Sequence, residues 1–147
     1  MALGRRGDHP EPASISDRDY ARLLAVRTAL RRFEHWSAER AAEHGLTASQ
    51  HQLLLAVRGH DGPDGPTISQ VADYLLIRHH SAVELIDRSA RAGLVERVPD
   101  ADDRRAIRLR LTADGTRILS ALTGAHLEEL TRLAALFESL IGTLSTQ

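Results

Sequence analysis

The sequence predicts a mainly α-helical (α+β) domain with one β-hairpin in its second half. Apolar residues recur at helical spacing through most of residues 16–92. Between residues 94 and 111 they alternate with period two in two short runs, and after Thr112 the helical spacing returns. At 147 residues the chain has the size of one domain and is long enough to bury a core.

Residues 14–46 are predicted to form a long first helix. Ser16 and Asp19 have the spacing of a capping box, and Gly45 supplies a stop signal. The preceding residues 1–13 are polar and rich in Gly and Pro, which predicts a disordered tail.

Two further capping boxes, Thr47 with Gln50 and Thr67 with Gln70, predict two short helices separated by the Gly- and Pro-rich loop at residues 59–66. A break near Leu76 or Ile77 precedes another helix, which ends before Gly93. The runs "LVERV" and "AIRLRL" then predict a hairpin whose loop is rich in charge, and Thr112 opens the last helical segment.

This order of elements is that of a winged helix-turn-helix. Residues 47–111 would form a DNA-binding lobe, and residues 14–46 and 112–147 would add dimerisation helices at its two ends. The terminal segments are amphipathic, and a small lobe cannot bury their apolar stripes completely. We therefore expect a homodimer.

Three motifs make the chain resemble the MarR family of bacterial transcriptional regulators: Asp103-Arg104-Arg105 in the hairpin loop, "LTADG" at residues 111–115 and "RAGLVERV" at residues 91–98. The resemblance implies that the terminal helices form a dimer, that the helix after residue 78 enters the DNA major groove and that the hairpin, or wing, reaches the minor groove. It also implies a small phenolic or aromatic effector whose binding releases DNA. The C-terminal segment looks shorter than the family's usual two-helix ending.

The wing is predicted to read DNA because a narrow minor groove has a strongly negative potential and accepts an inserted arginine. The resemblance implies that Arg105 inserts, that Asp103 holds its guanidinium and that Arg104 lies near a phosphate. The alternative interpretation is a solvated hairpin tip with no partner.

The first turn of the helix after the break would contribute contacts to bases and phosphates. The candidates on this helix are Arg78, His79, His80, Ser81 and Arg88. A polar face with internal salt bridges is the alternative. Thr67, Ser69 and Gln70 would bind a phosphate at a helix N-terminus, although capping alone also explains them.

Phe33, Trp36 and His51 are the predicted lining of an effector pocket, with a core or interface role as the alternative. Residues 67–111 hold eight arginines and seven acids, so we expect modest non-specific affinity for DNA. This thin basic footprint leaves open a winged-helix module that binds proteins and not DNA.

Several classes are disfavoured by composition. The chain has no Cys, no His/carboxylate cluster at metal-ligand spacing, no Gly-rich phosphate loop and no carboxylates paired for acid–base chemistry, so neither an enzyme nor a metal or cofactor site is expected. No apolar run approaches the roughly 20 residues that span a bilayer, and the N-terminus lacks the apolar core of a signal peptide. A cytoplasmic location is expected.

Overall fold

The computed structural model describes residues 14–142, and the predicted tail at residues 1–13 lies outside this part of the chain. The helices and strands are α1 (Asp17–Glu43), α2 (Ala48–Gly59), α3 (Ile68–Leu75), α4 (His79–Arg91), β1 (Val95–Pro99), β2 (Ile107–Leu111) and α5 (Ala113–Gly142). The mainly helical class with one hairpin is confirmed.

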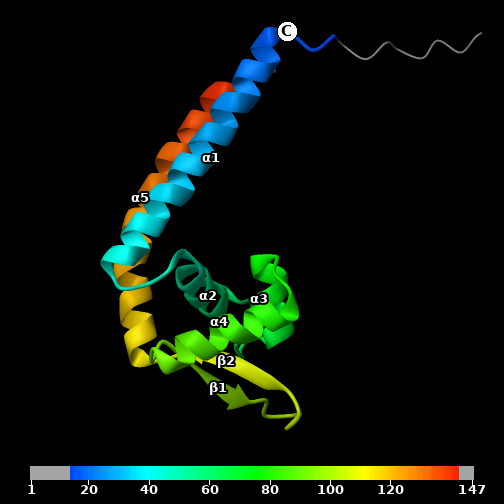
Figure 1. Cartoon of the computed structure of the whole chain (residues 1–147), viewed down its shortest axis with the longest axis vertical. Coiled ribbons are helices and arrows are strands. Elements are labelled where there is room, and N and C mark those ends of the chain that lie inside the picture. The colour runs from blue at the N-terminus through cyan, green and yellow to red at the C-terminus, as the bar shows by residue number, and fades with distance from the viewer. Residues whose placement is uncertain (1–13, 143–147) are drawn as a thin grey trace, which may run out of the picture.

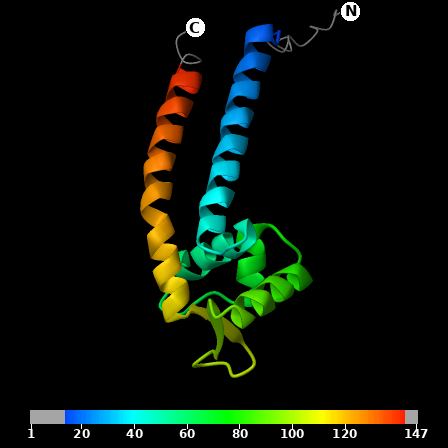
Figure 2. The ribbon, with the colours of Figure 1, turned by 60° about the vertical axis from the view of Figure 1, so that its left-hand side comes forward.

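Two long antiparallel helices form an arm that rises from a small lobe (Figure 1). The arm consists of α1 and the part of α5 beside it, and the lobe contains α2, α3, α4 and the hairpin. The start of α1 and the end of α5 lie at the end of the arm that is remote from the lobe (Figure 2). In the lobe, α3 and α4 form a helix-turn-helix and the hairpin forms the wing, as predicted.

All three predicted capping boxes are present. In each box, the side chain of the first residue accepts the backbone N–H of the residue three positions later. The side chain of that later residue in turn accepts the backbone N–H of the first residue. The pairs are Ser16 with Asp19, Thr47 with Gln50, and Thr67 with Gln70. These bonds satisfy N–H groups that have no partner within the helix.

The break between α3 and α4 occurs at Leu76, which has a left-handed backbone (φ 54°) and a side chain left 91% exposed. This conformation is unfavourable for a residue with a Cβ. It lets Ile77 donate its N–H to the carbonyl of Ala72, and α4 starts two residues later in a new direction.

One core joins the lobe to the base of the arm. Side chains that are almost completely buried come from α2, α3, α4, β2 and α5; they include Leu53, Leu54, Val71, Ile86, Leu109 and Leu122. Ala41 near the end of α1 belongs to the same cluster. Farther up the arm, α1 leaves Tyr20, Leu23 and Leu24 about 60% exposed.

Within the described residues the C-terminal segment forms a single helix, α5 over Ala113–Gly142. No proline interrupts this stretch, and Gly124 keeps a negative φ. A lone glycine inside a helix costs only about 1 kcal/mol, which is too little to end it.

The start of α5 is held against Gly93 and Leu94, which lie between α4 and β1. The Thr112 hydroxyl donates to the carbonyl of Gly93 (2.6 Å) and accepts the N–H of Gly115 (3.0 Å). A Cβ on Gly115 would lie 2.1 Å from the carbonyl oxygen of Leu94. The glycine of the "LTADG" motif is therefore required by the close approach of two backbones.

Replacing Gly115 with Ala is expected to lower the free energy of unfolding by about 2–3 kcal/mol, because a backbone atom blocks the new methyl group. Gly124→Ala in the same helix is the matched control, since nothing lies within 4 Å of its added Cβ. That variant should gain about 0.5–1 kcal/mol. Urea unfolding measures both, and equal stabilities would contradict the close approach.

Candidate nucleic-acid interface

The start of α3 uses two of its three candidate side chains for capping. Thr67 Oγ1 accepts the N–H of Gln70 (3.2 Å), and Gln70 Oε1 accepts the N–H of Thr67 (2.9 Å). Both residues are half-buried, whereas Ser69 is exposed. The capping interpretation therefore accounts for Thr67 and Gln70, and Ser69 is the side chain left available to an outside partner.

Helix α4 buries one face and exposes the other. Ala82, Leu85, Ile86 and Ser89 are buried against the core. The exposed side chains are those of His79, His80, Glu84, Arg88 and Arg91. Arg78 precedes the first turn and makes no capping hydrogen bond, and Ser81 is half-buried. The predicted candidates thus lie on the first turn and the exposed face of α4, with Ser81 at the edge.

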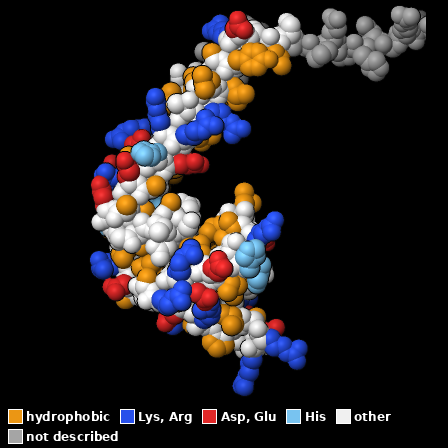
Figure 3. All heavy atoms as spheres, in the orientation of Figure 1, with side chains coloured by type: hydrophobic (Ala, Val, Ile, Leu, Met, Phe, Trp, Pro, Cys, Tyr) orange, Lys and Arg blue, Asp and Glu red, His pale blue; other side chains and the backbone are white. Residues whose placement is uncertain are grey.

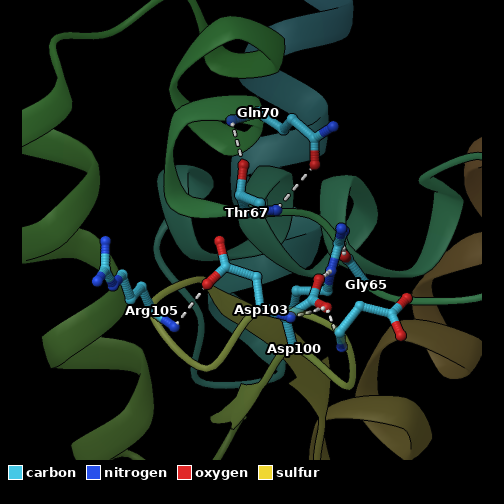
Figure 4. A network of polar contacts seen from close by, with 8 residues as sticks. Gly65, Thr67, Gln70, Asp100, Asp103 and Arg105 are labelled. Carbon is cyan, nitrogen blue, oxygen red and sulfur yellow. Dashed lines mark hydrogen bonds and ion pairs between the residues drawn. The ribbon is translucent and has the colours of Figure 1, made fainter.

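The wing tip is built around Asp100 and Asp103 (Figure 4). Asp100 Oδ1 accepts the N–H groups of Asp102 (2.8 Å) and Asp103 (3.2 Å), and its other oxygen pairs with Arg108. The hydrogen bond from Arg108, followed by those two backbone bonds, lowers the pKa of Asp100 to about 2. This carboxylate therefore stays ionised at neutral pH.

The structure shows a contact of Asp103 with Arg105 other than the one that the resemblance implies. Its carboxylate does not hold the guanidinium of Arg105 but accepts that residue's backbone N–H at 3.0 Å. The side chain of Arg105 extends away from it (Figure 4). A side chain that bonds the backbone two residues on shapes a tight turn, and this short-range bond leaves the long arginine side chain exposed.

Ion pairs divide the arginines between residues 67 and 111 into two groups. Arg97 pairs with Asp87, Arg108 with Asp100 and Arg110 with Glu96. Five arginines between residues 67 and 111 make no ion pair with a described residue: Arg78, Arg88, Arg91, Arg104 and Arg105. All five belong to α4 or its N-cap or to the wing tip, and Figure 3 shows basic side chains projecting from the end of the molecule opposite the arm.

The predicted effector residues meet only in part, at the joint between arm and lobe. Phe33 and Trp36 lie with ring centroids 6.0 Å apart, and both line a groove of about 720 Å³ between α1 and α5. His51 does not line this groove. Sequence reasoning missed His126, whose ring lies 4.8 Å from that of Trp36 and 4.6 Å from that of His51.

The tautomer of His126 follows from its contacts. Its Nδ1 faces the carbonyl oxygen of Leu122 (2.8 Å) and so carries a proton, which leaves Nε2 of the neutral ring to accept from the Ser37 hydroxyl (2.7 Å). His51 is 4% exposed, and its Nδ1 is buried with no hydrogen-bond partner among the described residues. Burial and the nearby His126 lower the pKa of His51.

Residues 14–142 contain no group of three or more His, Asp or Glu side chains placed to hold a metal ion. Among the same residues, no helix is both long and apolar enough to cross a membrane.

Known proteins are similar to this chain in part of its sequence and in the fold of its described residues. The MarR family profile matches residues 44–106. The HTH-type transcriptional regulator PecS of Dickeya dadantii is 26% identical over 87 residues, which cover 59% of this chain and 52% of PecS. The transcriptional activatory protein BadR of Rhodopseudomonas palustris is 33% identical over 109 residues, covering 74% of this chain and 60% of BadR. The match thus spans little more than half of each relative.

A solved structure of a mutant MarR from E. coli complexed with operator DNA has a TM-score of 0.64 and 19% identity, and the match covers 90% of this chain and 99% of that one. This likeness shows a common fold that includes both the arm and the lobe. The region that carries the helix-turn-helix and most of the wing is the part of this chain that is similar in sequence to the MarR family.

Proposed function

We propose that this chain is a sequence-specific, DNA-binding transcriptional regulator that acts as a homodimer. The observation that carries the proposal concerns residues 67–111. The five arginines there that have no carboxylate partner among the described residues all belong to α4, its N-cap or the wing tip. Arginine binds phosphates and guanine edges through a planar fork of donors. Arg78, Arg88 and Arg91 would serve the major groove, and Arg104 and Arg105 would serve the phosphate backbone and the minor groove.

The pairing of acids with arginines supports the same proposal. Asp87, Glu96 and Asp100 would repel phosphates if they were free, but each is neutralised by a neighbouring guanidinium. These three pairs leave five arginines and four acids between residues 67 and 111, so the proposal depends on where the free arginines lie and not on net charge. The relative MarR, which shares the fold, was crystallised with operator DNA.

We further propose that a small aromatic or phenolic effector releases the DNA, so that the chain acts as a repressor. The groove lined by Phe33 and Trp36 supports this role, since its walls are mainly apolar and it lies between the two helices of the arm. A ligand there would change how α1 and α5 pack, and both helices also contribute to the core of the lobe.

The arm supports the homodimer. It exposes Tyr20, Leu23 and Leu24 on α1, and α5 exposes Leu127, Leu130, Leu136 and Ile141. Large apolar surfaces of this kind are typical of interaction sites, and a second copy would also supply a second α4. Two copies of α4 predict a pseudo-palindromic operator with half-sites about one helical turn, roughly 34–36 Å, apart.

Light scattering after size exclusion tests the dimer. At micromolar concentration we expect a particle of twice the chain mass, because the apolar side chains of the arm need burial. A monomer alone would contradict the dimer and, with it, the two-fold operator.

Fluorescence anisotropy against duplexes from the upstream region of the chain's own gene tests the regulator. We expect selective binding that Arg105→Ala weakens about tenfold or more, since each lost base or groove contact costs about 1–3 kcal/mol. The matched control is Arg117→Ala, which removes an exposed arginine of α5 that pairs with Asp114. It should leave the affinity almost unchanged.

The salt dependence gives a second test of the interface. The slope of log K against log salt should be shallower than about −9, the value for roughly ten phosphate contacts. A steeper slope would require more phosphate contacts than this small set of unpaired arginines can make, and would contradict the proposed interface. Equal, weak binding to all duplexes, unaffected by Arg105→Ala, would favour a winged-helix module that binds proteins.

A further inference from the structure

Arg108 differs from the other arginines of the wing. Its Nη1 donates to the carbonyl oxygen of Gly65 (2.9 Å), and its Nε donates to the carboxylate of Asp100. Gly65 belongs to the loop before α3, and Asp100 begins the wing tip. One guanidinium therefore links the helix-turn-helix to the wing.

The same link continues from Asp100 into the tip. The second carboxylate oxygen of Asp100 accepts the N–H groups of Asp102 and Asp103, and Asp103 in turn accepts the N–H of Arg105. An unbroken chain of hydrogen bonds thus runs from Gly65 through Arg108 and Asp100 to the backbone of Arg105. We call Gly65, Arg108 and Asp100 the wing clamp.

Burial separates the wing clamp from an ordinary surface pair. The side chains of Arg108 and Asp100 are 25% and 10% exposed, whereas those of Arg110 and Glu96, on the same hairpin, are 65% and 47% exposed. Exposed pairs hold their partners weakly. The Arg108 guanidinium uses two of its five N–H donors for Asp100 and Gly65, and the carboxylate of Asp100 balances its charge.

We propose that Asp100 and Arg108 are positioning residues for DNA binding, which fix the wing tip relative to α3 and α4 and do not contact DNA themselves. This rests on the proposed function. The physical reason is entropic: α4 and the wing must reach adjacent grooves together, and a tip ordered before binding loses less conformational freedom on binding.

The test uses four variants of the full chain and the tightest-binding duplex selected from a random-sequence library. Arg108→Met keeps the length of the side chain and removes the clamp, and Arg110→Met is its matched control on the same strand. Asp100→Asn keeps one oxygen, which can still accept the N–H groups of Asp102 and Asp103. Its amide nitrogen replaces the oxygen that accepted from Arg108 Nε, and an amide nitrogen cannot accept a hydrogen bond. The double variant combines Asp100→Asn with Arg108→Met. Circular dichroism checks the fold of each.

The wing clamp predicts about tenfold weaker binding for Arg108→Met, with a salt slope equal to that of the wild type because no phosphate contact is lost. Arg110→Met should change the affinity less than about twofold, as expected for an exposed pair. Asp100→Asn should also weaken binding, although removing a negative charge near DNA would by charge alone strengthen it. The double variant should bind no worse than Arg108→Met, because both changes break one linkage.

Three results would overturn the proposal and leave the proposed function standing. The first is wild-type affinity in Arg108→Met, and the second is tighter binding by Asp100→Asn. The third is a slope of log K against log salt that is shallower in Arg108→Met by about one for each Arg108 that had bound a phosphate. If Arg108→Met does not fold, Asp100→Asn decides the matter by the sign of its effect. A wild-type chain that binds no duplex selectively would overturn the proposed function first, and the wing clamp's role in DNA binding with it.

Discussion

The strand β2 is hydrogen-bonded along both of its edges, and the geometry of the candidate interface depends on this. One edge pairs with β1, in a register that places Leu109 opposite Arg97. At the other edge, Leu109 donates its N–H to the carbonyl of Pro66 (2.9 Å), and Thr67 forms an antiparallel bridge with Arg108. A Cβ on Gly65 would lie 1.7 Å from the carbonyl oxygen of Leu109, so only glycine permits this approach. The first turn of α3 and the wing are consequently one unit.

The arrangement explains how a chain with little net charge can present a basic surface. The residues that hold the unit together are charged, but they are paired, and the pairs lie along the hairpin and at its contact with α4. Between residues 67 and 111, the arginines without an ion pair to a described residue belong to the N-cap and exposed face of α4 and to the projecting wing tip. Backbone geometry thus decides which charges remain available, and the composition of the lobe alone does not.

Much of the fold could be predicted from sequence because its signals are local. A capping box needs residues three apart, and the hairpin needs a change of period within about twenty residues. The capping boxes, the break at Leu76 and the wing follow from such patterns.

The wing clamp and the contact of His51 with His126 could not be predicted, because Gly65 and Arg108 are 43 residues apart and the two histidines belong to different helices. The bond from the backbone N–H of Arg105 to Asp103 could not be predicted for another reason. A carboxylate close to an arginine can accept from the arginine's backbone or from its side chain, and residue identity does not distinguish the two.

Hydrogen exchange at the amide of Leu109 tests most directly whether the helix-turn-helix and the wing are one unit. In an isolated two-stranded hairpin this N–H would face solvent at an open edge and exchange rapidly. Because it is bonded to Pro66 and its residue is fully buried, it should exchange as slowly as the amide of Ile86 in the core of the lobe. Exchange as fast as that of Arg104 at the exposed tip would mean that the wing moves independently of α3 and would contradict this account.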